Sequence, residues 1–133
     1  MILVDSSVWI DFLRGVSNSQ SNQLAAWLLE AQAELAIADL VIFEVMRGIG
    51  NPREKRRAKS LLLTMTVVEI GGVENALQAA EHYSQLRAQG YTIASPIDVL
   101  QASFCIAFGH ILLHRDADFD VLGSLRGLKA WSH

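Results

Sequence analysis

The stretch Met1-Ile2-Leu3-Val4-Asp5 opens the chain with an apolar run that ends on an acid. A short apolar run of this kind is typical of a buried strand in a parallel sheet. A second run at residues 111–113 is followed within a few residues by Asp116 and Asp118. A carboxylate beside a core segment is costly unless it is paired, hydrogen-bonded or bound to a metal. The stretches that predict the fold therefore also predict a site.

Short apolar runs alternate along the chain with segments of helical periodicity. We expect strands at residues 1–5, 35–38, 67–70, 110–113 and, at a sheet edge, 128–131. We expect helices at residues 6–14, 22–33, 39–47, 53–64, 73–89 and 96–109, with Asp39 capping the third. Polar loops are expected at residues 17–22 and around Asp116 and Asp118. This alternation predicts an α/β fold in which helices cover both faces of a mainly parallel sheet.

The composition fits one domain over residues 1–133. Hydrophobic residues make up 51% of the chain and the mean hydropathy is +0.27, so folding should need no disulfide or structural metal. The single cysteine, Cys105, excludes an internal disulfide and a cysteine-based zinc site, and it fits a reducing cytoplasm. The net charge of −3 argues against nucleic-acid binding through a global positive field, but a local basic patch remains compatible with it. Neither a signal peptide nor a membrane span is expected.

Five acids are predicted to share one edge of the sheet, because strand carboxyl ends and the amino ends of the following helices lie together there. They stand at strand ends or near helix starts: Asp5, Glu44, Asp98, Asp116 and Asp118. Two carboxylates about 4 Å apart repel by roughly 4 kcal/mol at an effective dielectric constant near 20. Such a cluster must take up protons or bind a divalent cation. Oxygen ligands without a cysteine or histidine set favour Mg²⁺ or Mn²⁺.

Two of these acids have a second interpretation as helix caps. Asp5 could cap the helix that follows it, but Ser6 and Ser7 are available for that role, which favours the metal site. Asp98 fits a capping box with Ser95, an arrangement that is compatible with metal binding.

The other three acids also have simpler interpretations. Glu44 lies on a mostly apolar helix and could pair with Arg47 on an exposed stripe. Asp116 and Asp118 could be ordinary turn residues. The joint placement of all five on one rim, and not any single acid, is what points to a metal site.

Four motifs, in this order, resemble PIN-domain ribonucleases of the VapC toxin type. They are ILVDSSVWIDFLRG at residues 2–15, EVMRG at residues 44–48, SPIDVLQA at residues 95–102 and LLHRDADF at residues 112–119. The resemblance covers nearly the whole chain. The chain departs from it at His114, where the family usually has threonine or serine, and no acid is lost by that change.

The resemblance implies a three-layer α/β/α sandwich and Mg²⁺- or Mn²⁺-dependent cleavage of RNA. Asp5, Glu44, Asp98 and Asp116 match the family's four acids, and Asp118 matches a position that is sometimes a further acid. By this resemblance Asp5, Asp98 and Asp116 hold metal, while Glu44 and Asp118 hold a second ion or orient water. Water activated by the metal would attack the phosphodiester and leave a 3′-hydroxyl and a 5′-phosphate. Either Ser6 or Ser7 matches a polar position near the metal.

The resemblance also implies partners. A cognate VapB-type antitoxin holds such a toxin inactive, often by placing a basic side chain among the acids, and the toxins usually form dimers. An anionic pocket attracts an arginine as well as Mg²⁺, which fits the charge predicted here.

A basic run on the helix at residues 53–64 is the most concentrated positive charge in the sequence. It contains Arg53, Lys55, Arg56, Arg57 and Lys59. It is either a solvated helix face or an RNA-backbone contact, and its first candidates for RNA binding are Arg53, Arg56, Arg57 and Lys59. The four histidines are scattered, and none is assigned to a metal.

Two other function classes remain open at this point. One is a different Mg²⁺-dependent phosphohydrolase or a receiver-like phospho-acceptor. Phosphatases with an aspartyl nucleophile need a second aspartate two residues after the first, where this chain has Ser7. The other is a non-catalytic PIN-like module that only binds a partner, and the intact set of acids argues against it.

Overall fold

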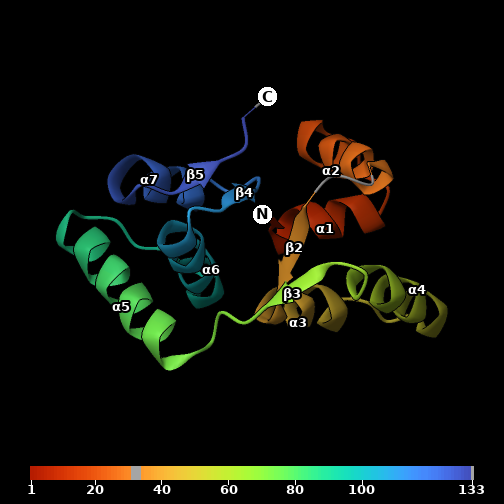
Figure 1. The fold of residues 1–133 in the computed structure, drawn as a ribbon, viewed down its shortest axis with the longest axis horizontal. Helices are drawn as coiled ribbons and strands as arrows, with labels where there is room; N and C mark the ends of the chain where they lie inside the picture. The colour runs from red at the N-terminus through yellow and green to blue at the C-terminus, as the bar shows by residue number, and fades with distance from the viewer. Residues whose placement is uncertain (31–33, 133) are drawn as a thin grey trace.

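A five-stranded parallel sheet forms the centre of the computed structural model, which describes residues 1–30 and 34–132 (Figure 1). The strand order is β3-β2-β1-β4-β5, and every neighbouring pair is parallel. The strands are β1 (Ile2–Val4), β2 (Leu35–Ala38), β3 (Thr66–Val68), β4 (Ile111–Leu113) and β5 (Lys129–Ala130). The predicted parallel sheet is confirmed, with β5 as an edge strand.

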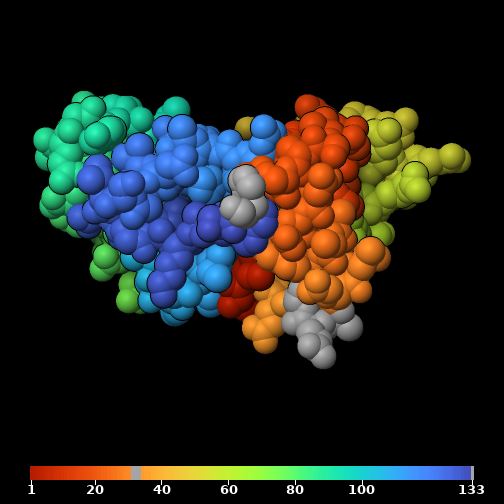
Figure 2. All heavy atoms as spheres, turned by 90° about the horizontal axis from the view of Figure 1, so that it is seen from above, coloured from red at the N-terminus to blue at the C-terminus, as the bar shows by residue number. Residues whose placement is uncertain are grey.

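Helices cover both faces of this sheet. The described residues form α1 (Ser6–Leu13), α2 (Ser19–Leu29), α3 (Asp39–Arg47), α4 (Pro52–Leu62), α5 (Val73–Ala88), α6 (Pro96–Phe108) and α7 (Ala117–Arg126). The first four lie on one side of the sheet and the last three on the other (Figure 1). Seen from above, the N-terminal and C-terminal halves lie side by side (Figure 2). None of these helices has both the length and the apolar character of a membrane span.

The strand side chains alternate between two separate cores. Leu3 and Leu112 pack in the cluster beneath α5, α6 and α7, while Val4 and Leu113 pack in the cluster beneath α1 to α4. All four are fully buried. Successive side chains of a strand point to opposite faces, so a strand buried on both faces reads as a continuous apolar run. This confirms the three-layer α/β/α sandwich.

The loop predicted around Asp116 and Asp118 is wrong, because α7 begins there. Asp116 is the N-cap of α7, and its Oδ1 accepts a hydrogen bond from the backbone N–H of Asp118 at 2.9 Å. Phe119 and Leu122 are fully buried one helical turn apart, and Gly127 ends the helix at φ +83°. A capping aspartate and an apolar pair three residues apart are helix signals, but the polar residues around them suggested a turn.

The start of α2 also differs from the prediction of a polar loop at residues 17–22. Asn18 accepts a hydrogen bond from the Ser21 N–H at 2.8 Å, and the Ser21 hydroxyl accepts one from the Asn18 N–H at 3.0 Å. This reciprocal capping box starts the helix at Ser19. The predicted end of this helix, at residues 31–33, lies outside the described residues.

Asp39 does not cap its helix as predicted. It is the first residue of α3, and its Oδ1 accepts a hydrogen bond from the Ile70 N–H at 3.1 Å. Because Ile70 follows β3, this contact satisfies a backbone donor just past a sheet edge and joins α3 to it.

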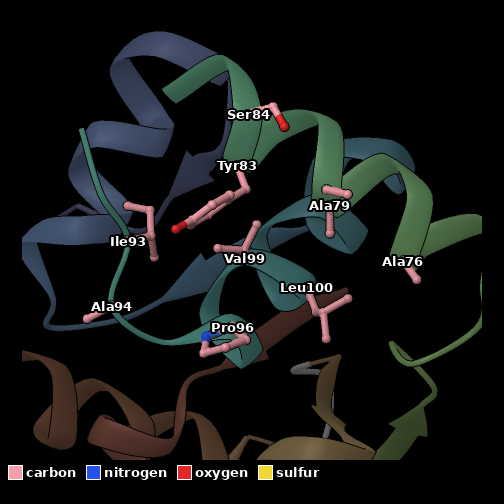
Figure 3. A pocket seen from close by; sticks show the side chains of 10 residues that line it. Ala76, Ala79, Tyr83, Ser84, Ile93, Ala94, Pro96, Val99 and Leu100 are labelled. Atoms are coloured by element: carbon pink, nitrogen blue, oxygen red, sulfur yellow. The ribbon is translucent and has the colours of Figure 1, made fainter. Parts of the chain in front are cut away.

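One face of α5 is largely open. Leu86 is buried, but Ala76 and Ala80 are exposed. They line an apolar hollow of about 490 Å³ between α5 and α6, together with Tyr83, Val99 and others (Figure 3). Small side chains leave this gap unfilled.

A candidate metal centre at the carboxyl edge of the sheet

The sheet topology brings the predicted acids to one edge. Asp5 follows the central strand β1, and Asp116 follows its neighbour β4. Glu44 lies in α3, which follows β2 on the other side of β1, and Asp98 lies in the first turn of α6. Asp118 lies in the first turn of α7. Strand ends and helix starts therefore present all five side chains to one region, as the parallel-sheet rule predicts.

These acids form two groups that share one member. Asp5, Glu44 and Asp98 each offer a carboxylate oxygen within 4.8 Å of the others, and so do Asp98, Asp116 and Asp118. Asp98 is 7% exposed and stands between the two groups. Every acid that the sequence predicted for the site is in one of them.

Asp5 has the most complete set of hydrogen bonds in the site. Its Oδ2 accepts from the Ser7 N–H at 3.1 Å and from the Ser7 hydroxyl at 2.6 Å, and its Oδ1 accepts from Gln101 Nε2 at 2.9 Å. Asp5 is only 3% exposed and is the N-cap of α1. The availability of other caps was therefore a wrong reason to prefer the metal site: Asp5 caps the helix and also belongs to the acid cluster.

The two serines after Asp5 serve different acids. Ser7 donates to Asp5, while a side-chain hydrogen bond links Ser6 to Glu44. In the described part of the chain Glu44 and Arg47 do not form the suggested ion pair. The Arg47 guanidinium carbon lies instead 5.4 Å from the centre of the Phe43 ring. Ser7 thus orders the Asp5 carboxylate, and Ser6, the residue before it, stabilises the charge on Glu44.

Burial and mutual repulsion raise the pKa of two acids. Burial raises the pKa of Asp98 to about 7, with further contributions from the charges on Asp5, Glu44, Asp116 and Asp118. Burial and the charge on Asp5 also raise the pKa of Glu44, against the opposing effects of Ser6 and Arg47. Losing water and approaching like charges both disfavour the ionised form. The cluster therefore holds a proton near neutral pH or needs a cation to replace it.

The donor set fits a hard divalent cation. All of the grouped ligand atoms are carboxylate oxygens, the type that Mg²⁺ and Mn²⁺ prefer. Glu44 Oε1 is buried without a hydrogen-bond partner among the described residues, so an acceptor in the cluster is left for a ligand. Cys105 is buried in the core beneath α5 to α7, and burial raises the pKa of its thiol to about 12. It therefore offers no thiolate to a metal.

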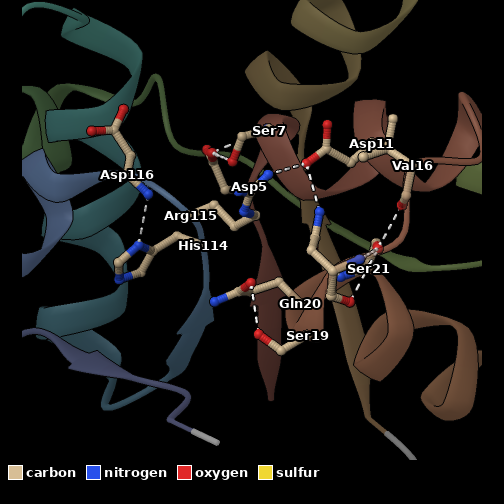
Figure 4. A network of polar contacts seen from close by, with 11 residues as sticks. Asp5, Ser7, Asp11, Val16, Ser19, Gln20, Ser21, His114, Arg115 and Asp116 are labelled. Carbon is tan, nitrogen blue, oxygen red and sulfur yellow. Dashed lines mark hydrogen bonds and ion pairs between the residues drawn. The ribbon is translucent and has the colours of Figure 1, made fainter.

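His114 supports the loop that carries Asp116. Its Nδ1 accepts a hydrogen bond from the Asp116 N–H at 3.2 Å (Figure 4). Its Nε2 lies 3.8 Å from Asp120 Oδ1. Burial lowers the pKa of His114, so the neutral imidazole that can accept this bond is favoured. The imidazole thus supports the backbone of the fourth motif where the resembling family usually has a hydroxyl.

An ion pair fastens the same turn to α1. Arg115 Nη1 donates to Asp11 Oδ2 at 2.8 Å, and Asn18 Nδ2 donates to the same oxygen at 3.1 Å (Figure 4). A hollow of about 510 Å³ opens beside this pair, lined by Gln20, His114, Arg115, Asp116, Asp120, Trp131 and others. Polar and aromatic side chains thus adjoin the acid cluster, in contrast to the apolar hollow of Figure 3.

Comparison with known proteins shows which family has this arrangement of acids and fold. The family model described as the PIN domain matches residues 2–125. The chain belongs to the PIN domain family. Ribonuclease VapC11 of Mycobacterium tuberculosis is 28% identical to this PIN domain over 132 residues, which cover 99% of this chain and 98% of that protein.

Solved structures share the PIN fold at low sequence identity. VapBC2 from Rickettsia felis, solved with a fragment of promoter DNA, matches with a TM-score of 0.76 and 20% identity, over 99% of this chain and 100% of that one. VapC20 of Mycobacterium tuberculosis, described as a toxin that cleaves the sarcin-ricin loop, matches with a TM-score of 0.70 and 17% identity, over 92% of this chain and 95% of that one.

The basic run of this PIN domain lies apart from the two acid groups. Arg53, Arg56, Arg57 and Lys59 are all exposed on α4, which packs against α3 at one end of the molecule (Figures 1 and 2). Gln101 is the site residue that sequence analysis missed, because a glutamine in an otherwise apolar helix carries no motif of its own. Its sequence signals were its position one turn after Asp98 and its place inside the motif SPIDVLQA at residues 95–102.

Proposed function

We propose that this PIN domain is a divalent-metal-dependent endoribonuclease that acts as the toxin of a VapC-type toxin–antitoxin pair. The observation that carries the proposal is the sharing of buried Asp98 between two groups of acids at the carboxyl edge of the sheet. Membership of the PIN family, the relative named as a ribonuclease and the structural neighbour described as an RNA-cleaving toxin support it. In this proposal residues 1–133 act as one domain in the cytoplasm.

Asp5, Asp98 and Asp116 would hold the cation, which we take to be Mg²⁺ or Mn²⁺. Bound there, such an ion neutralises charge on a phosphate oxygen and lowers the pKa of coordinated water. Glu44 and Asp118 would complete the coordination of a second ion or orient the attacking water. Ser7 holds Asp5 in place through two hydrogen bonds, and Asp98 would have to be ionised to hold the cation.

The RNA would approach across the hollow that adjoins Asp116. The hollow offers a guanidinium from Arg115, an amide from Gln20 and the indole of Trp131. These groups suit phosphate, base edges and base faces respectively. The exposed cations of α4 supply a second positive surface for the RNA backbone.

The partner in this proposal is a VapB-type antitoxin, and the toxin itself is a homodimer. The acid cluster would attract a basic antitoxin side chain as a substitute for the cation. Co-expression with the product of the neighbouring reading frame, followed by light scattering of the purified complex, tests both points. A monomeric toxin that copurifies with no partner would contradict them.

The decisive experiment is sequencing of RNA ends after incubation with purified protein. We expect cleavage in Mg²⁺ or Mn²⁺ that leaves 5′-phosphates, none in EDTA, and none with folded Asp98→Asn. Equal cleavage in EDTA would rule out the metal-dependent mechanism. Turnover of phosphate monoesters without cleavage of RNA would instead favour the phosphohydrolase alternative.

A further inference from the structure

Gln101 is a long polar side chain that is buried between the acid cluster and apolar residues of α6. It lies on α6 one helical turn after Asp98 and is 0% exposed. Its neighbours on the buried side of the helix, Ala102 and Cys105, belong to the core beneath α5 to α7. A buried amide is unfavourable unless its donors and acceptor find partners, so the reason for a glutamine at this position lies in what it contacts.

Among the residues that the structure describes, the Gln101 amide has one hydrogen-bond partner, Asp5. Gln101 Nε2 donates to Asp5 Oδ1 at 2.9 Å, while Gln101 Oε1 is buried and without a hydrogen-bond partner in the described residues. The opposite orientation of the amide would put an acceptor against a carboxylate oxygen, which is repulsive. The contact with Asp5 therefore sets the orientation of the Gln101 amide. This orientation leaves the Gln101 carbonyl oxygen without a hydrogen bond.

The same contact determines which oxygen of Asp5 remains available. An ionised carboxylate can accept about four hydrogen bonds, about two on each oxygen. Ser7 supplies two donors to Oδ2, and Gln101 supplies one to Oδ1. The one acceptor direction left is on Oδ1, and the amide of Gln101 fixes where that oxygen sits.

We propose that Gln101 is a positioning residue of the metal site, which orients the Asp5 carboxylate so that Oδ1 accepts a divalent cation. This inference rests on the proposed function for the nature of the ligand. It assigns Gln101 no contact with RNA or with the reacting atoms. Residues that hydrogen-bond to a metal ligand typically change metal affinity or activity by about 10–100-fold when they are replaced.

The test compares two variants of α6 by titration with Mn²⁺. Gln101→Met keeps the length of the side chain and removes both amide groups. Ser103→Ala is the matched control, because Ser103 is 1% exposed on the same helix and its Oγ has no hydrogen-bond partner in the described residues. We expect Gln101→Met to raise the Mn²⁺ dissociation constant about 10-fold or more, and Ser103→Ala to leave it unchanged, with both variants folded by melting temperature.

A second measurement uses the unaltered protein and covers the case in which Gln101→Met does not fold. The side-chain NH₂ resonances of Gln101 should shift on titration with Mg²⁺, with the same midpoint as the backbone amide of Asp5. Wild-type Mn²⁺ affinity in folded Gln101→Met, or unmoved Gln101 resonances, overturns the role of Gln101 alone. A wild-type protein that binds no Mn²⁺ overturns that role together with the proposed metal-dependent function.

Discussion

A carboxylate oxygen of Asp98, in the first turn of α6, lies within 4.8 Å of one from Asp5, at the end of β1. Burial, together with the charges on Asp5 and three other acids, raises the pKa of Asp98 to about 7. The fold thus brings acids together at a cost that a bound proton or a cation can remove. This relationship makes the stability of the metal-free protein depend on pH.

Metal-free protein should lose stability as the pH rises from about 4 to about 7. In this window folded Asp98 keeps a proton that the unfolded chain has released, since its pKa is about 7 when folded and 3.8 ordinarily. The stabilisation is complete below about pH 4 and is lost as the pH rises through 7; it amounts to about 4 kcal/mol at most. Urea unfolding in EDTA at pH 5 and pH 8 measures it. The difference in unfolding free energy between wild type and Asp98→Asn isolates the contribution of Asp98. If the wild type instead became more stable relative to Asp98→Asn between pH 5 and pH 8, the raised pKa of Asp98 would be contradicted.

Binding of a divalent cation should release a proton near neutral pH. Because Asp98 must be ionised to act as a ligand, the cation displaces its proton below about pH 7. Calorimetric titrations with Mn²⁺ at pH 6 in buffers of different ionisation enthalpy should show about one proton released, and the apparent affinity should rise up to about pH 7 and then level off. Affinity that is independent of pH between 5.5 and 7.5 would show that the ion binds elsewhere.

Asp5→Ala should abolish RNA cleavage and cell toxicity while the fold persists, but Asp5→Asn is the sharper variant. Asp5 also caps α1 by accepting the Ser7 N–H, so the alanine loses both the ligand and a cap that is typically worth about 1 kcal/mol. Asparagine keeps a capping oxygen and removes the charge. Both variants should be inactive, with Asp5→Ala melting at the lower temperature. Cleavage at the wild-type rate by either folded variant would falsify the role of Asp5.

The sequence predicted the acids of this site better than it predicted the groups that support them. Asp5 and Asp116 end apolar runs, and a parallel sheet brings such positions to one edge whatever the details of the loops. The contact between Gln101 and Asp5 joins residues 96 positions apart. It depends on how α6 rotates against the sheet, and no local pattern encodes that rotation.

The misplaced elements have a similar origin. The start of α7 was read as a turn because Asp116 and Asp118 favour turns and caps equally well. Asp39 was predicted to be a cap because capping preferences depend only on neighbouring residues. They contain no information on the Ile70 N–H, which the Asp39 side chain contacts only after folding. Tertiary contacts decide between two local interpretations in both cases.

The basic face of α4 should contribute to RNA affinity through phosphate contacts. Replacing Arg53, Arg56 and Lys59 by glutamine removes three exposed cations and leaves the acid cluster intact. If all three contact phosphates of single-stranded RNA, the slope of log affinity against log salt should become shallower by about 2. Filter binding in Ca²⁺, over a range of salt concentrations, measures the slope. The control is Arg87→Gln, at an exposed site on α5, which should leave the salt slope unchanged. If the slope of the triple variant also stayed unchanged, α4 would be a solvated face without RNA contacts.

Asp118→Asn should separate the two groups of acids, because Asp118 belongs only to the group formed with Asp98 and Asp116. The side chain keeps its shape, and its carbonyl can still accept the Ala94 N–H that Asp118 Oδ2 accepts at 3.5 Å. If each group holds an ion, saturating Mn²⁺ should fall from two ions per chain to one, while Asp98→Asn weakens both sites because Asp98 is common to them. Electron paramagnetic resonance of free Mn²⁺ counts the bound ions. A single bound ion in the wild type, unaffected by Asp118→Asn, would instead assign Asp118 to orienting water.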